Sequence, residues 1–147
     1  MTGEKMRITI RKEDYDTMIR HAVSVCPEEA CGLIAGTDRE DGTREIQKVY
    51  LMENTDHTNE HFSIDPIRQL QAIKDMRKAG LRPLGNWHSH PETPSRPSEE
   101  DKRLANDAKA SYLILSLEVP DHPVLRAFHI EGEQDNRTVR IEELIIL

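Results

Sequence analysis

The stretch "GNWHSHPETPSRPSEED", from Gly85 to Asp101, joins the end of an expected strand to the start of an expected helix. Side chains two residues apart on a strand point to the same face, so His88 and His90 project together. Three prolines stiffen the loop that follows. Ser98 and Asp101 then form an S-x-x-D pattern, which is typical of a capped helix N-terminus. If the loop folds this helix turn back, two imidazoles and a carboxylate meet.

The rest of the chain predicts a mixed α/β fold. Apolar residues at helical spacing indicate helices, and alternating or apolar runs between turn residues indicate strands. The helices are expected at 12–25, 66–79 and 98–110, and the strands at 6–10, 30–36, 44–52, 61–65, 82–90, 112–118, 123–131 and 138–147. Helices mixed with consecutive strands predict an α/β sandwich around a curved sheet, formed by a single domain over residues 1–147.

Composition and charge exclude several classes of protein. The 147 residues include 27 Asp and Glu against 20 Lys and Arg, a net charge of −7. Because the basic residues are scattered and phosphate backbones attract positive charge, nucleic-acid binding is not expected. No apolar run approaches the ~20 residues of a membrane span. The start "MTGEKMRITI" lacks the apolar core of a secretory signal, so a cytoplasmic location is expected.

The two histidines and Asp101 suit a zinc site. Two nitrogens and one oxygen leave a fourth position for water, which is the arrangement of a catalytic rather than a structural zinc. A plainer interpretation also exists, because H-x-H occurs on exposed strands and a capping box alone explains the spacing of Ser98 and Asp101. The two interpretations are compatible, since a cap fixes the turn that presents Asp101. Trp87 is expected to pack in the core beside the site, and His61 is a candidate accessory group.

The two cysteines, Cys26 and Cys31, are expected to be reduced thiols with at least one of them buried. A disulfide or half of a metal site stays open, although C-x4-C without a second pair is weak evidence for either. Neither thiol is expected to be catalytic, because no histidine is near them in the sequence and a zinc site would already supply a nucleophile.

The pattern H-x-H-P, six residues and then S-x-x-D resembles the signature of the JAMM (MPN+) zinc metalloproteases, compact prokaryotic type. The matching residues are His88, His90, Pro91, Ser98 and Asp101. The family also has an upstream glutamate in a P-x-E-x-x-G-like setting, and "CPEEACGLIAG" (26–36) is similar to it, which places that role on Glu29 rather than on Glu28. The order of strands and helices agrees over nearly the whole chain.

The resemblance implies a fold and a role for each matching residue. The fold would be a curved mixed sheet flanked by helices, the cytidine-deaminase-like or MPN-type sandwich. His88, His90 and Asp101 would bind Zn²⁺. Glu29 would take a proton from the attacking water and pass it to the leaving amine, and Ser98 would stabilise the oxyanion of the intermediate.

The resemblance also implies a class of substrate. JAMM enzymes cleave amide or isopeptide bonds after the C-terminal tail of ubiquitin-like proteins, and members that cut ubiquitin chains carry insertions around the site. A chain of 147 residues has little room for such insertions and looks more like the members linked to ubiquitin-like sulfur carriers. The expected partner is therefore a ubiquitin-like or sulfur-carrier protein with a Gly-Gly terminus.

Three alternatives remain from the sequence. A catalytically silent MPN-type scaffold would bind protein partners without zinc, but its usual mark is the loss of ligands, and none is lost here. A general zinc peptidase would use the same residues on other substrates. A cupin-like barrel also uses H-x-H, but it needs a glutamate a few residues later in an all-β chain. Glu92 is too close for that role, and the three expected helices argue against it.

Overall fold

The structure, a computed structural model, describes residues 6–147 and has seven strands and three helices in that range. Residues 1–5, part of the stretch expected to contain no leader, lie outside the described residues. In chain order the elements are β1 (Arg7–Ile10), α1 (Lys12–Val25), β2 (Cys31–Asp38), β3 (Arg44–Met52), α2 (Pro66–Lys78), β4 (Arg82–His90), α3 (Glu99–Leu104), β5 (Ser111–Ser116), β6 (Val124–Glu133) and β7 (Asn136–Ile146).

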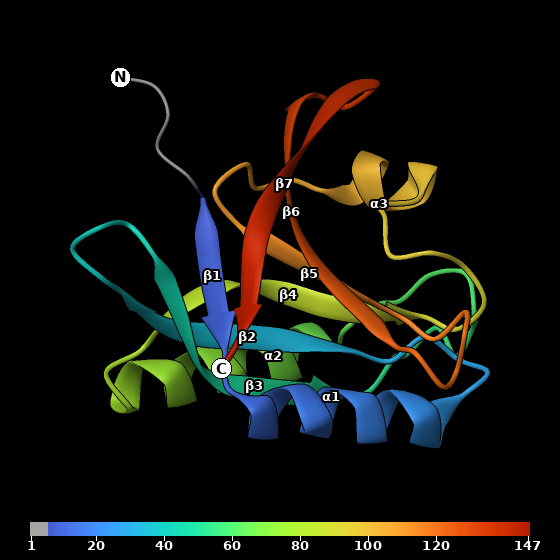
Figure 1. The fold of residues 1–147 in the computed structure, drawn as a ribbon, viewed down its shortest axis with the longest axis horizontal. Coiled ribbons are helices and arrows are strands. Elements are labelled where there is room, and N and C mark those ends of the chain that lie inside the picture. Colours follow the sequence, from blue (N-terminus) through green and yellow to red (C-terminus); the bar gives the residue numbers. More distant parts are fainter. Residues whose placement is uncertain (1–5) are drawn as a thin grey trace.

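The seven strands form one mixed sheet that curves until it closes. The strand order is β1-β3-β2-β4-β5-β6-β7, and β1 pairs in parallel with both β3 and β7. β4 and β5 are also parallel, whereas the other neighbours are antiparallel. Irregularities at Ala35 and Gly36 shift the register of β2, and bulges of this kind bend a strand. The expected curved mixed sheet with flanking helices is confirmed, and its closure goes beyond the expectation (Figure 1).

Two apolar clusters hold α1 and α2 to the sheet. Met18 and Ala22 of α1 pack with Ile34 and Trp87 in the larger cluster. Met76 of α2 packs in a second cluster with other side chains of β2. Since neighbouring residues of a strand point to opposite faces, the two clusters lie on opposite sides of the central strands. Both α1 and α2 appear in the lower part of Figure 1, while α3 stands apart at the upper right.

Trp87 is fully buried, as expected, and it depends on a glycine in the next strand. Its indole N–H donates to the carbonyl oxygen of Tyr50 at 3.1 Å, across β2. A Cβ atom on Gly32 would lie 2.4 Å from the indole nitrogen and 1.8 Å from the Tyr50 oxygen. Only glycine therefore allows this crossing, which fixes the strand that ends at the two histidines.

Two expected elements differ from the structure. The strand predicted at 61–65 does not form, because the backbone there bonds to side chains: Asn54 accepts from the Ser63 N–H and donates to the His61 carbonyl. The helix predicted at 98–110 ends at Leu104, after which Ala105 adopts an extended conformation and is buried. Asp107 then accepts from the Lys109 N–H in a turn, so local side-chain bonding replaces further helix.

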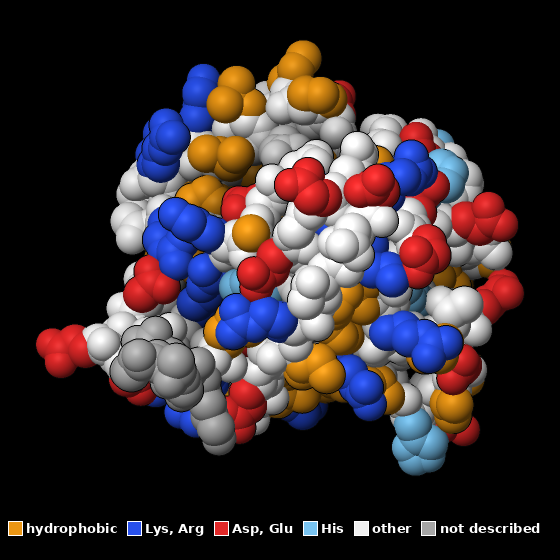
Figure 2. Space-filling model, turned by 90° about the horizontal axis from the view of Figure 1, so that it is seen from above, with side chains coloured by type: hydrophobic (Ala, Val, Ile, Leu, Met, Phe, Trp, Pro, Cys, Tyr) orange, Lys and Arg blue, Asp and Glu red, His pale blue; other side chains and the backbone are white. Residues whose placement is uncertain are grey.

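The surface charges are mixed, as the scattered basic residues of the sequence predict. Acidic and basic side chains are interspersed over the face seen from above (Figure 2). Within residues 6–147, no helix is long and apolar enough to cross a membrane.

Candidate metal centre

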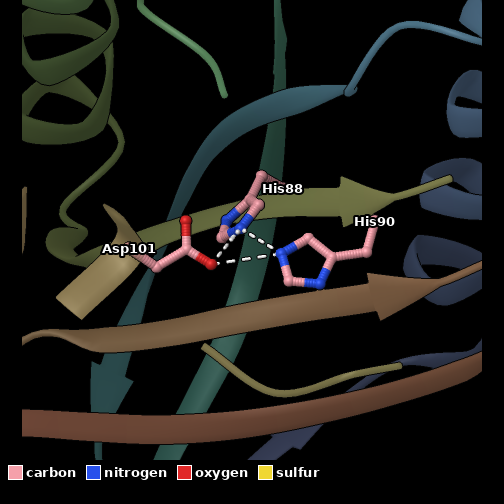
Figure 3. Close-up of side chains that lie close together, drawn as sticks. All are labelled: His88, His90 and Asp101. Atoms are coloured by element: carbon pink, nitrogen blue, oxygen red, sulfur yellow. Dashed lines mark hydrogen bonds and ion pairs between the residues drawn. The ribbon is translucent and has the colours of Figure 1, made fainter. Parts of the chain in front are cut away.

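His88, His90 and Asp101 converge at the end of β4 and the first turn of α3 (Figure 3). The two Nε2 atoms of the histidines lie 3.1 Å apart. The Oδ2 atom of Asp101 lies 3.2 Å from Nε2 of His88 and 3.1 Å from Nε2 of His90. Ligands at zinc distances of about 2.0–2.1 Å in a tetrahedron are ~3.3 Å apart, so this spacing fits a zinc ion.

The loop between the strand and the helix is fastened to β5. Ser95 Oγ donates to the Ile114 carbonyl at 2.7 Å, and Ser116 Oγ donates to the Thr93 carbonyl at 2.6 Å. β5 runs parallel to β4, so the end of β5 lies beside the point where the chain leaves β4. These bonds fold the loop back and bring α3 to the histidines.

The helix cap and the metal cluster share one oxygen atom. Asp101 Oδ2 accepts from the Ser98 N–H at 2.9 Å, and Ser98 Oγ accepts from the Asp101 N–H at 3.0 Å. This is the capping box expected from the spacing. The same Oδ2 faces both histidines, so the capping interpretation and the metal interpretation are compatible.

The hydrogen bonding of His90 tests whether the cluster suits a cation. Its Nδ1 lies 2.9 Å from the carbonyl oxygen of Pro94, which can only accept, so Nδ1 carries the proton. In a neutral ring Nε2 is then unprotonated, yet it faces the Asp101 carboxylate oxygen at 3.1 Å. Two acceptors at this distance repel unless a cation or a proton lies between them. An outer N–H bond of this kind typically orients a metal-binding histidine.

The charges of the cluster shift the pKa values of its members. Burial alone would raise the pKa of Asp101, but hydrogen bonding to His88, the charge of His88 and hydrogen bonds to His90 and Ser98 hold it well below its usual range. Burial likewise opposes the charged form of His90, but its bonds to Asp101 and Pro94 raise its pKa above the usual value. The site thus stabilises positive charge beside an ionised carboxylate.

Glu29 lies just before β2, and its side chain is buried next to the cluster. Its Oε1 atom has no hydrogen-bond partner among the described residues. Burial raises the pKa of Glu29 to about 8, although the charge of His90 opposes the rise and that of Asp101 adds to it. Glu28, in contrast, is only half-buried and pairs with His57 at 3.1 Å. Glu29 and not Glu28 is therefore the acid in the electrostatic field of the cluster.

A pocket of about 250 Å³ opens beside His88 and Asp101. It lies between the sheet, α3 and the segment before α2, and its walls are mostly apolar, including Leu33, Phe62, Ile64, Tyr112, Ile114 and Ile130. His61 also lines the pocket, but it pairs with Asp56 at 2.9 Å and is not part of the cluster.

Phe62 is a site residue that the sequence reasoning missed. Its ring stacks on that of His88, with centroids 4.8 Å apart and planes 28° apart. The sequence offers only a weak indication of this role. Phe62 is one of two phenylalanines in the chain and stands shortly before the capped start of α2. The contact restricts the orientation of a candidate metal ligand from the side of the pocket.

The two cysteines are free, with Cys31 buried and Cys26 exposed, so the expectation of at least one buried thiol is confirmed. Burial, with added repulsion from Glu29 and Asp56, raises the pKa of Cys31 to about 12. A thiol with such a pKa stays protonated at neutral pH, which makes Cys31 a poor nucleophile.

Comparisons with known proteins find one family model and several named relatives that are similar to this chain. A family model described as prokaryotic homologs of the JAB domain matches residues 11–131. A CysO-cysteine peptidase of Mycobacterium tuberculosis is 29% identical over 137 residues, covering 92% of each chain. A probable TtuB-protein conjugate cleaving protease of Thermus thermophilus is 33% identical over 87 residues, or 58% of this chain and 54% of that protein. A solution structure from Desulfitobacterium hafniense has a TM-score of 0.85 and 48% identity, covering 95% of this chain and 92% of that one.

The cluster predicts that Asp101→Asn binds zinc much more weakly. The amide oxygen can still accept the capping bond from Ser98, but the negative charge of the ligand is lost. We expect at least a ~100-fold loss of affinity, because replacing even outer hydrogen-bond partners of zinc ligands costs 10–100-fold. Competition with a chromogenic chelator measures the affinity. Glu100→Gln, a neighbouring acid outside the cluster, is the control, and full zinc affinity in Asp101→Asn would exclude Asp101 as a ligand.

The raised pKa of Glu29 predicts a pH dependence of stability in metal-free protein. A carboxyl group whose pKa rises to about 8 on folding holds a proton that the unfolded chain has already lost, so the free energy of unfolding falls as pH rises from about 5 to 8. The raised pKa of His90 acts in the same direction. Urea unfolding in the presence of chelator should show this decline in the wild type and in Glu28→Gln, and a shallower decline in Glu29→Gln. An unchanged slope in Glu29→Gln would contradict the assignment.

Proposed function

The chain belongs to the family of prokaryotic homologs of the JAB domain, and from this premise we propose that it is a zinc-dependent peptidase that hydrolyses an amide or isopeptide bond. The observation that carries the proposal is the convergence of two imidazole nitrogens and one carboxylate oxygen within 3.2 Å, beside a buried glutamate. The peptidase names of the relatives support the same reaction class.

His88, His90 and Asp101 would hold the zinc ion through the atoms that face one another. When bound, zinc would supply Lewis acidity, polarising the substrate carbonyl and lowering the pKa of water. The protein's part is to keep three ligand atoms fixed. The bond from His90 Nδ1 to Pro94 does so without using Nε2, and the bond from the Ser98 N–H holds the same Asp101 oxygen that would bind the ion.

Glu29 would act as the general base and then as the general acid. Its carboxyl group has a high affinity for a proton because it is buried, and the positive charge of a nearby cation favours the ionised form. Because these two effects oppose each other, the group can both take a proton from water and return one to the leaving amine.

Ser98 would donate to the oxyanion that develops on the substrate. Its Oγ atom accepts from the Asp101 N–H, which leaves the hydroxyl proton available for donation. The capping bond also fixes where that hydroxyl lies relative to the cluster. A donor fixed before the reaction stabilises developing charge without a cost of reorganisation.

The substrate we propose is a small ubiquitin-like or sulfur-carrier protein joined through its Gly-Gly terminus to cysteine or to a lysine amine. The names CysO-cysteine peptidase and TtuB-protein conjugate cleaving protease support this class. Glycines have no side chains to collide with the walls of a narrow site, so such a tail can reach buried ligands in an extended form. The cytoplasmic location expected from the sequence remains a prediction.

A catalytically silent scaffold for protein partners is the second candidate function. The convergence of His88, His90 and Asp101 beside buried Glu29 supports catalysis over a scaffold. A zinc-loaded protein that turns over substrate would be a peptidase, whereas a scaffold would show no turnover.

Glu29→Gln should keep the fold and the zinc content yet lose nearly all turnover. The amide is similar in size to the carboxylate but cannot take a proton from water, and loss of a general base typically costs 10²–10⁴-fold. The measurements are zinc content and kcat on the same preparation. Glu28→Gln, at a half-buried neighbour that pairs with His57, is the matched control and should retain wild-type kcat. Inactive Glu28→Gln with active Glu29→Gln would shift the role by one residue.

The substrate proposal predicts that the enzyme releases the intact carrier from a Gly-Gly-linked adduct. Mass spectrometry of the carrier before and after incubation should show loss of the added cysteine or lysine peptide. A bulky residue in place of the penultimate glycine should abolish cleavage, and Glu29→Gln enzyme is the negative control. Equal cleavage of unrelated unfolded peptides without a Gly-Gly end would leave only a general zinc peptidase.

A further inference from the structure

Asn54 uses every hydrogen-bonding position of its side chain in the loop between β3 and α2. It is buried, and its Nδ2 donates to the carbonyl oxygens of Glu29 and His61, both at 3.1 Å. Its Oδ1 accepts from the N–H groups of Asp56 at 3.0 Å and Ser63 at 3.2 Å. Two donors face two carbonyls and one oxygen faces two N–H groups, so the carboxamide is fully satisfied in this one orientation.

The backbone of Glu29 is held by this loop. Its N–H donates to the Thr58 carbonyl at 2.7 Å, and its carbonyl oxygen accepts from Asn54 at 3.1 Å. Glu29 precedes β2, which begins at Cys31, so it lies outside the ladder of the sheet. Asn54 and Thr58, both in this loop, therefore bind the two polar groups of the Glu29 backbone and fix the point from which its side chain extends.

The Asn54 side chain also holds the backbone next to Phe62, the aromatic residue that contacts the cluster. By binding the His61 carbonyl, Asn54 fixes the residue before Phe62, whose ring stacks on His88. One buried carboxamide thus connects the buried glutamate with the aromatic contact on a candidate metal ligand.

We propose that Asn54 is a positioning residue that acts through Glu29. This inference rests on the proposed function, in which Glu29 moves protons. A general base must lie within about 2.6–3.2 Å of the proton it takes. Misplacement by ~1 Å can cost about 10²-fold in rate. Loss of the bond from Nδ2 releases the Glu29 backbone on one side, so proton transfer slows while the zinc ligands and the substrate pocket keep their residues.

The test compares Asn54→Asp with a loop variant that leaves Glu29 untouched. Aspartate keeps the oxygen that accepts from residues 56 and 63 but cannot donate to Glu29 or His61. We expect kcat to fall about 10–100-fold per folded, zinc-loaded chain, with KM changed less than twofold. Thr55→Val is the matched control, because exposed Thr55 donates from Oγ only to Ser63, at 3.2 Å, in the same loop. It should keep wild-type kcat.

Two further measurements keep the test decisive. Asn54→Ser, whose hydroxyl is too short to reach both carbonyls, is measured in parallel, with the folded fraction taken from circular dichroism. In chelator-treated protein, NMR hydrogen exchange at the Glu29 N–H should be at least tenfold faster in the Asn54 variants than in Thr55→Val. That readout needs neither zinc nor substrate.

The outcomes separate this inference from the proposed function. If Glu29→Gln is inactive and both Asn54 variants retain wild-type kcat and slow exchange at Glu29, the positioning role is overturned and the peptidase proposal stands. If Glu29→Gln is active, the proposed function itself falls. A loss of zinc content that accounts for the whole loss of rate in the Asn54 variants would also overturn the inference, because Asn54 would then act through His88.

Discussion

The Oδ2 atom of Asp101 is the atom on which the site depends. It accepts the capping bond from the Ser98 N–H and faces the Nε2 atoms of both histidines at 3.1–3.2 Å. The start of α3 and the position of a candidate metal ligand are therefore one constraint. A helix that began one residue earlier or later would turn the carboxylate away from the histidines and leave two imidazoles, which are an incomplete set for zinc.

The sheet provides the rigidity that this constraint needs. β4 carries the histidines and lies between β2, which Glu29 precedes, and β5, which anchors the proline loop through Ser95 and Ser116. Apolar clusters cover the central strands on both sides. The two histidines are thus held on backbone that cannot shift without disturbing a packed core. Beside them, burial keeps the pKa of Glu29 raised to about 8.

The sequence predicted the parts of the structure that local patterns determine. The helix over 12–25 has its expected bounds, Asp65 caps α2 as predicted, and the H-x-H and S-x-x-D spacings bring their residues together. What failed was set by the pairing of distant strands and by side-chain hydrogen bonds within loops. The closure of the sheet depends on pairing of β1 with β7, and the expected strand at 61–65 is replaced by bonds to Asn54. A lone asparagine in a loop carries no sequence signal for such a role.

Proton balance connects the geometry of the site to its chemistry. Without a cation, the unprotonated Nε2 of His90 and the Asp101 carboxylate face each other, so a proton must lie in the cluster, in keeping with the raised pKa of His90. Glu29 also keeps its proton at neutral pH, because its pKa is raised to about 8. A metal ion that enters the cluster replaces the first proton and weakens the hold on the second, so metal affinity must rise with pH. Burial favours the protonated form of Glu29 in the free protein, whereas a bound cation would favour its ionised form. The site is therefore organised around positive charge, supplied by protons in the free protein and by a metal ion in the enzyme we propose.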